Sequence, residues 1–319
     1  MEVLRDGDSP LEGARSSVTA IGVFDGLHRG HQRVLEEVCR VARSRGGVAT
    51  VVTFDPHPAL VLNPADAPRL LATIEQRLEG LARLGIERVR VLAFNEVLAQ
   101  ESAMAFVERV VVQELGTTDV VVGNDFRFGH DRRGNVALLE AAGQRLNFRV
   151  HPAPIYGGAQ RWSSTAVRQH LSAGDVASAT EILGRPFVMR ARVVHGDARG
   201  ATLGYPTANV EGTPRQQLPG IGIYAGAVRT AHGKWWPGAI SLGRRPQFYV
   251  DGVLLVEVHL IGFDGDLYDE VLDLAFLSHL RAEATFHDVP TLVAQIKRDV
   301  ARSLEIYAKF SPESAALLG

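Results

Sequence analysis

The sequence predicts two domains. Residues 1–184 are expected to form an α/β domain with a parallel, Rossmann-like sheet, and residues 185–319 a small antiparallel β-barrel with a C-terminal helix. Strand and helix patterns alternate through the first half, which favours parallel strands joined by right-handed crossovers. Short segments with alternating apolar residues then follow one another between Gly and Pro turns. The 319 residues are enough for two separate cores.

The predicted strands of the first half are continuous apolar runs, as expected when helices cover both faces of a sheet. They span residues 18–24, 49–54, 88–94 and 119–122. Apolar residues at helical spacing predict helices at 32–44, 74–84, 103–115 and 135–147. In such sheets ligands bind beyond the carboxyl ends of the strands. The loops at 22–31, 54–58 and 123–129 each follow a strand, so we expect them to meet at one edge.

The second half contains predicted strands at 187–195, 223–228, 253–260 and 271–276. A helix is expected at the junction, over 173–183, and another closes the chain at 289–307, where apolar residues recur every four positions. Glu257 interrupts an otherwise apolar strand. A carboxylate in that setting is expected to be paired or functional, and it could accept a proton from a hydroxyl nucleophile.

Composition and charge restrict the function classes. The chain is 46% apolar and 22% charged, which is typical of a globular protein. A net charge of −2 without a basic stripe gives no case for nucleic acid as a partner. The absence of a long apolar run or of a signal-peptide pattern argues against a membrane and favours a cytoplasmic enzyme. The single cysteine, Cys39, is expected to be a packing or surface residue rather than a catalytic one, and a homo-oligomeric state stays open.

The most informative motif is the turn at 22–31, where a strand leads into a helix. Exposed N–H groups and the helix dipole favour phosphate there, and Gly26 lets the backbone approach a ligand. His28 and His31 share a face if the helix begins at this point. Two imidazoles can donate hydrogen bonds to the charge that develops as pyrophosphate leaves a nucleotide. The turn predicts nucleotidyl transfer; the alternatives are a simple Gly/His turn or, without a third ligand, a less favoured zinc site.

Two further loops carry candidate ligand-binding groups. Prolines stiffen the turn at 52–58, whereas the segment 123–129 places aromatic rings around a cation, which suits a planar ring and a phosphate. The alternatives are a Pro-rich loop with a capping Asp, and core phenylalanines. The candidate residues are Phe54, Asp55, Pro56, His57, Pro58, Asp125, Phe126 and Phe128.

Hydroxyl groups and glycines mark two more segments. Ser163, Ser164, Thr165 and Arg168 open a helix and form a candidate phosphate clamp, or are simply helix caps. In the second half, Gly196, Gly200 and Gly204 make a candidate backbone cradle. Thr207 and Asn209 are two residues apart, so on an extended segment their oxygens face one way, which suits Mg²⁺. The alternative for this segment is a Gly-rich hairpin.

Taken together, these motifs resemble the prokaryotic bifunctional riboflavin kinase/FMN adenylyltransferase (FAD synthetase) family, from about residue 18 to residue 307. The resemblance implies an N-terminal nucleotidyltransferase domain and a C-terminal kinase barrel. ATP would phosphorylate riboflavin to FMN, and a second ATP would transfer AMP to FMN, which gives FAD and pyrophosphate. The implied cofactor is Mg²⁺, and the implied partners are the small molecules riboflavin, FMN and ATP.

The resemblance also implies roles for individual residues. In the first domain His28 and His31 would be catalytic, and the eight residues of the two aromatic and Pro-rich loops would bind FMN. Contacts to ATP are implied for Gly22, Phe24, Asp25, Gly26, Ser163, Ser164, Thr165 and Arg168. In the second domain Glu257 would be the catalytic base, and Arg281 and Glu283 would contact the flavin. Contacts to ATP there are implied for Gly196, Gly200, Gly204, Thr207 and Asn209, of which the last two would hold the metal.

Four positions depart from the family pattern, all in the kinase half. They are Ala201, Tyr205, Arg244 and Gln247, and the change to Tyr205 from phenylalanine is mild. Arg244 adds bulk and charge near the expected kinase pocket. The alternative function is therefore an FMN adenylyltransferase whose kinase domain is inactive or altered in flavin specificity.

Overall fold

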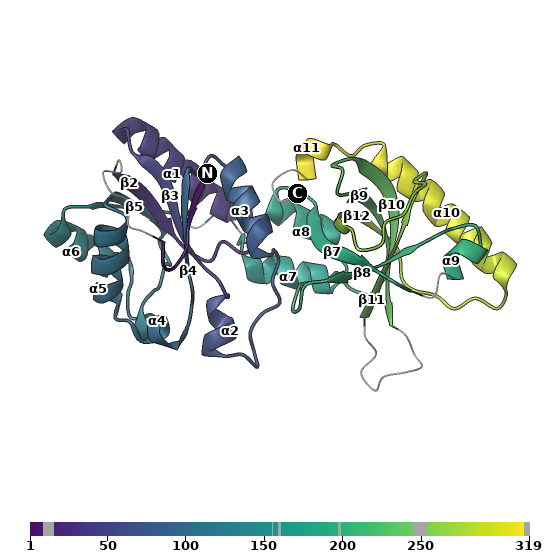
Figure 1. The fold of residues 1–319 in the computed structure, drawn as a ribbon, viewed down its shortest axis with the longest axis horizontal. Helices are drawn as coiled ribbons and strands as arrows, with labels where there is room; N and C mark the ends of the chain where they lie inside the picture. Colours follow the sequence, from purple (N-terminus) through teal and green to yellow (C-terminus); the bar gives the residue numbers. More distant parts are fainter. Residues whose placement is uncertain (9–15, 155, 159–160, 197–198, 245–253, 316–319) are drawn as a thin grey trace. The chain divides into compact units, whose positions relative to one another are not determined.

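The computed structural model describes residues 1–8, 16–154, 156–158, 161–196, 199–244 and 254–315. The chain divides into two compact units: residues 1–68 with 77–162, and residues 69–76 with 163–319. Many of the elements of each unit are labelled in Figure 1. The domain boundary expected at residue 184 stays a prediction.

The first unit is built on a six-stranded parallel sheet with the strand order β1-β4-β3-β2-β5-β6. Four buried strands confirm the predicted ones: β2 (Ser17–Ile21), β3 (Val48–Phe54), β4 (Arg88–Leu92) and β5 (Thr117–Gly123). The edge strands β1 (Glu2–Leu4) and β6 (Arg149–Ala153) were not expected. Both are short and carry little apolar pattern, so their pairing depends on the neighbouring strand.

The helices of this unit confirm the predicted positions. They are α1 (Arg29–Arg45), α6 (Val136–Leu146) and α3 (Ile74–Arg83), whose residues from Arg77 onward belong to this unit. The helix expected over 103–115 is a short α5 (Ala103–Phe106) that continues as the π-helix η1 (Val107–Glu114). Helix α1 packs on β2, β3 and β5. Three short segments were not predicted: α2 (Pro58–Leu62), α4 (Glu96–Gln100) and the 3₁₀ turn η2 (His130–Arg132).

The second unit contains a closed antiparallel barrel with the strand order β10-β11-β8-β7-β12-β9. Four strands confirm the prediction: β7 (Phe187–Val194), β9 (Gly222–Arg229), β11 (Leu254–Leu260) and β12 (Val271–Arg281). Strands β8 (Ala208–Gly212) and β10 (Trp235–Arg244) were not among the predicted strands. Proline and glycine are disfavoured inside strands, and β10 contains both, at Pro237 and Gly238.

Helix α10 (Val289–Tyr307) confirms the predicted C-terminal helix and packs on β9, β10 and β12. The helix expected over 173–183 begins later: α8 covers Val176–Leu183, and a separate helix α7 covers Ser164–Ser172. Gly174 lies between them with a φ of +77°, a conformation that interrupts a helix. The short helices α9 (Arg199–Thr202) and α11 (Pro312–Ala315) complete the unit. Within the described residues, no helix has the length and apolar character needed to cross a membrane.

Candidate functional sites

The two histidines of the 22–31 turn lie together, as predicted. His28 caps α1, because its Nδ1 accepts a hydrogen bond from the His31 N–H at 3.3 Å. The rings of His28 and His31 stack with 3.6 Å between their centroids and 22° between their planes. Phe24 meets the His31 ring edge-on, with 5.3 Å between the centroids. The imidazoles therefore form one rigid pair at the positive end of a helix.

The backbone that leads to this pair is strained and well packed. Phe24, Gly26 and Leu27 have φ angles of +54°, +78° and +44°, in the region that side chains other than glycine rarely adopt. The side chains of Phe24 and Leu27 are buried, and so is Asp25. Surrounding packing of this kind holds a strained turn in a single conformation.

His31 is held in its neutral form. Burial, and secondarily the charge of His28, lowers the pKa of His31 well below its ordinary value of 6.5. Within the described part of the chain, its Nδ1 is buried without a hydrogen-bond partner. A neutral imidazole can donate one hydrogen bond without carrying a permanent charge.

The lowered pKa predicts an acid-sensitive first unit. Between the folded pKa of His31 and its unfolded value of 6.5, the unfolded chain binds more protons than the folded one. Stability is therefore lost as the pH falls below the unfolded value, by up to about 1.4 kcal/mol per pH unit. Urea unfolding of wild type and His31→Gln between about pH 5 and pH 8 measures how the free energy of unfolding changes with pH. The variant should show the weaker pH dependence.

A matched control for this experiment is His232→Gln, since His232 is an exposed histidine of the second unit. It should keep the wild-type pH dependence. Equal pH dependence of stability in wild type and His31→Gln would show that His31 is not the source of the acid sensitivity.

The loops that follow β2, β3 and β5 meet around one cavity of about 710 Å³, as the sheet pattern predicted. Much of its wall is aromatic: Phe54, Phe94, Phe106, Phe126 and Phe128. Phe126 and Phe128 stack with 5.3 Å between their centroids. Gly22, Pro58 and Asp125 also line this aromatic cavity, and Asp125 pairs with Arg161.

Other predicted residues lie outside this lining. His57 caps α2, with its Nδ1 accepting from the Ala59 N–H at 3.1 Å, and Asp55 and Pro56 precede it. Conversely, the sequence did not point to Phe94, Glu101 or Arg132, which do line the cavity. These three lie on segments without a motif.

Arg77 is a further residue of this site that the sequence motifs did not indicate. It is buried, and its guanidinium donates to the carbonyl oxygens of Val23 at 2.9 Å and Phe54 at 3.2 Å. Thr53 Oγ1 also donates to the Val23 carbonyl, at 3.0 Å. These bonds tie the histidine turn to the end of β3. The available signal was an arginine on the same face of the predicted helix as Leu81.

The serine–threonine segment belongs to the second unit. Ser163 Oγ caps α7 by accepting from the Ala166 N–H at 3.2 Å, which is the helix-cap alternative. Arg168 Nε donates to the Arg69 carbonyl at 2.6 Å. A phosphate-binding role of Ser163, Ser164, Thr165 and Arg168 stays a prediction.

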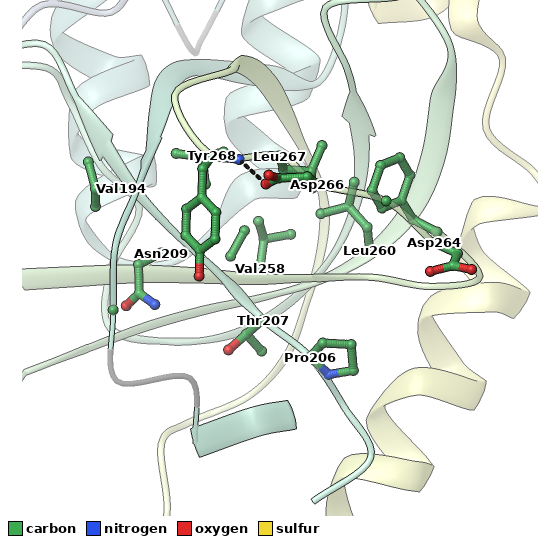
Figure 2. A pocket seen from close by; sticks show the side chains of 15 residues that line it. Val194, Pro206, Thr207, Asn209, Val258, Leu260, Asp264, Asp266, Leu267 and Tyr268 are labelled. Atoms are coloured by element: carbon green, nitrogen blue, oxygen red, sulfur yellow. Dashed lines mark hydrogen bonds between the residues drawn. The ribbon is translucent and has the colours of Figure 1, made fainter. Parts of the chain in front are cut away.

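Two cavities of the barrel share Thr207 and Asn209 in their walls. The smaller, about 310 Å³, is also lined by Gly196 and by the loop residues Asp264 to Tyr268; Figure 2 shows Thr207, Asn209 and Tyr268 around it. The larger, about 510 Å³, is also lined by Glu257. A ligand in either cavity would therefore meet the same Thr and Asn side chains.

Strand register brings Glu257 between two polar neighbours. On β11 it stands opposite Asn209 of β8 and opposite Ser241 of β10, and all three line the larger cavity. Among the described residues, no hydrogen bond or ion pair reaches the Glu257 carboxylate. Glu257 was expected to be either paired or functional. Without a described partner, its carboxylate is available to accept a proton.

Two glycines allow close approach in the barrel. A Cβ on Gly196 would lie 1.9 Å from Nδ2 of Asn209, and a Cβ on Gly243 would lie 2.6 Å from Oε1 of Glu283. Gly200 lines the larger cavity, whereas Gly204 lines neither. Only a residue without a side chain fits at positions 196 and 243 with their neighbours in place.

Gly243→Ala tests the second of these contacts. We expect the methyl group to displace the Glu283 carboxylate within the larger cavity. On the flavin-binding role that the resemblance implies for Glu283, the KM for riboflavin should rise about tenfold, a change of about 1.4 kcal/mol. The KM for ATP should change less, because Gly243 does not line the smaller cavity. Steady-state kinetics of FMN formation measure both constants, and an unchanged riboflavin KM would contradict the expectation.

Helix α10 supplies part of the larger cavity that the motifs did not indicate. Asp299, which is buried, accepts from Arg281 Nη2 at 2.8 Å and from Gln295 Nε2 at 2.8 Å. The Arg281 guanidinium also lies over the Phe286 ring, 5.7 Å from its centroid. Arg281 is thus fixed at the cavity wall by an ion pair. The available signal was an acidic residue on the apolar face of the predicted helix.

Of the four departures from the family pattern, Tyr205 lines the larger cavity, and the other three fall largely outside the described part of the chain. Gln247 lies in a segment that the structure does not describe, and the side chains of Ala201 and Arg244 are not described either. The backbone of Arg244 pairs with Leu254 at the end of β10.

Comparison with known proteins finds a family match in each half of the chain. A family model for FAD synthetase matches residues 11–166, and one for riboflavin kinase matches residues 183–307. The bifunctional riboflavin kinase/FMN adenylyltransferase of Pseudomonas fluorescens is 40% identical to this chain, over 92% of this chain and 94% of that protein. The enzyme of the same name from Escherichia coli K12 is 36% identical, over 95% of this chain and 96% of that protein.

A solved structure shares the whole fold. It is a Streptococcus pneumoniae chain named a macrolide-efflux protein, which superposes with a TM-score of 0.85 and 28% identity over 98% of this chain and 100% of that one. That name concerns the other protein, and the likeness shows a shared fold. From the family matches and the relatives together, this chain belongs to the bifunctional riboflavin kinase/FMN adenylyltransferase family.

Proposed function

We propose that this protein makes FAD from riboflavin in two ATP-dependent steps. The observation that carries the proposal is that one chain holds two sites suited to phosphorus chemistry. One is the stacked pair His28 and His31 at a helix N-terminus, and the other is Glu257 in a cavity with Thr207 and Asn209.

The barrel would catalyse phosphorylation of riboflavin. Because Glu257 lines only the larger cavity, we assign the flavin to that cavity and ATP to the smaller one. The phosphates would then pass Thr207 and Asn209, which line both. The flavin 5′-hydroxyl attacks the γ-phosphorus, Glu257 takes its proton, and the bond from the γ-phosphorus to the ADP oxygen breaks.

The donor set near the phosphates suits Mg²⁺. Kinases and adenylyltransferases use ATP with a divalent metal ion. Mg²⁺ prefers oxygen ligands and is commonly held by one or two protein groups together with substrate phosphates. Thr207 and Asn209 offer side-chain oxygens of this kind. When bound there, Mg²⁺ would neutralise charge on the ATP phosphates.

The first unit would catalyse adenylyl transfer. The isoalloxazine ring of FMN suits the aromatic cavity, since flat rings stack on aromatic side chains. A phosphate oxygen of FMN attacks the α-phosphorus of ATP, and the bond to the pyrophosphate oxygen breaks. The nucleophile is already an anion and needs no strong base. His28 and His31 would donate hydrogen bonds to the charge that develops on the leaving pyrophosphate.

One incubation separates this proposal from its alternative. The full chain is mixed with riboflavin, ATP and Mg²⁺, and the flavins are separated by chromatography. We expect FMN first and FAD later. Formation of FAD only from supplied FMN would favour the adenylyltransferase with an inactive kinase barrel, and the riboflavin kinase match over 183–307 argues for two activities. A cytoplasmic location stays a prediction.

A further inference from the structure

His259 lies beside the proposed catalytic carboxylate of the barrel, and the motifs gave it no role. It stands on β11 two residues after Glu257, so the two side chains share a strand face. Both line the larger cavity. A titratable ring at this distance along the strand is either a second proton carrier or a group that holds the site in place.

The hydrogen bond of His259 decides between these roles. Its Nδ1 lies 2.7 Å from the carbonyl oxygen of Pro206. A carbonyl oxygen only accepts, so Nδ1 carries the proton and donates it. The Tyr205 ring meets the imidazole edge-on, with 5.6 Å between centroids and 79° between planes, and so fixes its orientation.

This bond joins β11, which carries Glu257, to the segment that leads into β8. The backbone pairing between β8 and β11 includes Glu257 opposite Asn209 and Val258 opposite Ala208. The side chain of His259 prolongs this pairing to Pro206, the residue before Thr207. The position of Thr207, which lines both cavities, is thereby tied to the strand of Glu257. In-line phosphoryl transfer needs the nucleotide phosphates and the base at a fixed separation.

We infer that His259 is a positioning residue for phosphoryl transfer, which holds the Pro206–Thr207 segment in register with Glu257 through its Nδ1–H. This inference rests on the proposed kinase activity. It assigns no proton transfer to His259.

Three substitutions in the full chain test the inference. Asn places an amide N–H close to the position of Nδ1, Gln places it near Nε2, and Ala removes it. We expect His259→Ala and His259→Gln to lower kcat for FMN formation on the order of 10²-fold, a typical effect of misplacing reacting groups by about 1 Å. His259→Asn should recover most of that loss. The KM values for riboflavin and ATP should change far less than kcat, because each ligand keeps its own cavity.

The pH profile and two controls complete the test. His259→Asn should keep the wild-type shape of kcat against pH. Failure of Asn to restore activity, or loss of one limb of the profile, would overturn the inference in favour of acid–base catalysis. Equal loss in all three variants together with a lowered melting temperature would also overturn it, as a merely structural role. The exposed His232→Ala should match wild type. If wild type itself makes no FMN, the proposed function fails instead.

Discussion

The Glu257→Gln variant is expected to lose FMN formation while it still converts supplied FMN to FAD. The amide keeps the size of the side chain but cannot accept the proton of the flavin hydroxyl. General-base catalysis typically contributes about 10²- to 10⁴-fold, so kcat for FMN formation should fall by that factor. Chromatography of flavins formed from riboflavin and ATP, and separately from FMN and ATP, measures both steps in one chain.

A matched control is Glu211→Gln on the neighbouring strand β8, where the side chain is exposed. It changes the net charge equally and should leave both steps near wild-type rates. FMN formation by Glu257→Gln within about twofold of wild type would remove Glu257 from the proposed mechanism, since a base contributes at least about 10²-fold.

The second large effect is expected at the histidine pair. His28→Ala and His31→Ala should each lower FAD formation from FMN by about 10²- to 10³-fold, the usual cost of removing one donor to a developing charge. FMN formation from riboflavin in the same preparation serves as the internal reference. It should continue near the wild-type rate.

His28 also caps α1, so a capping loss must be separated from a chemical one. His28→Asn provides this control, because Asn is among the best N-cap residues. We expect His28→Asn to retain the stability of α1 and still lose FAD formation. Wild-type FAD formation in that variant would show that capping, and not the imidazole, is what the site needs.

Local sequence patterns were sufficient to predict the elements whose apolar residues follow one another without interruption. Helix α10 and strands β3 and β11 lie close to their predicted positions because their apolar spacing is continuous. Strand β10 was missed because Pro237 and Gly238 break its pattern. It forms because β9 and β11 pair with it on both sides. Glycine at position 238 also allows close packing, since a Cβ there would lie only 2.8 Å from Val228 Cγ2. There, packing in the barrel outweighs strand propensity.

The residues of the candidate sites also divide into those with local partners and those with partners distant in the sequence. His28 and His31 could be placed from the sequence because their relation depends on one local event, the start of α1. Arg77 and His259 could not, since their partners Val23 and Pro206 are more than 50 residues distant along the chain, at separations of 54 and 53. Such contacts depend on which strands become neighbours and in what register.

The sequence by itself determined the chemistry of this protein: which loops follow which strands, and that histidines, hydroxyls and one isolated carboxylate stand at them. The tertiary structure decided the geometry in which those groups act. It set Glu257 between Asn209 and Ser241 and tied Pro206 to His259. The physical reason is that side-chain identity and helix starts are local, whereas the register of a closed barrel is fixed only when all six strands pair together.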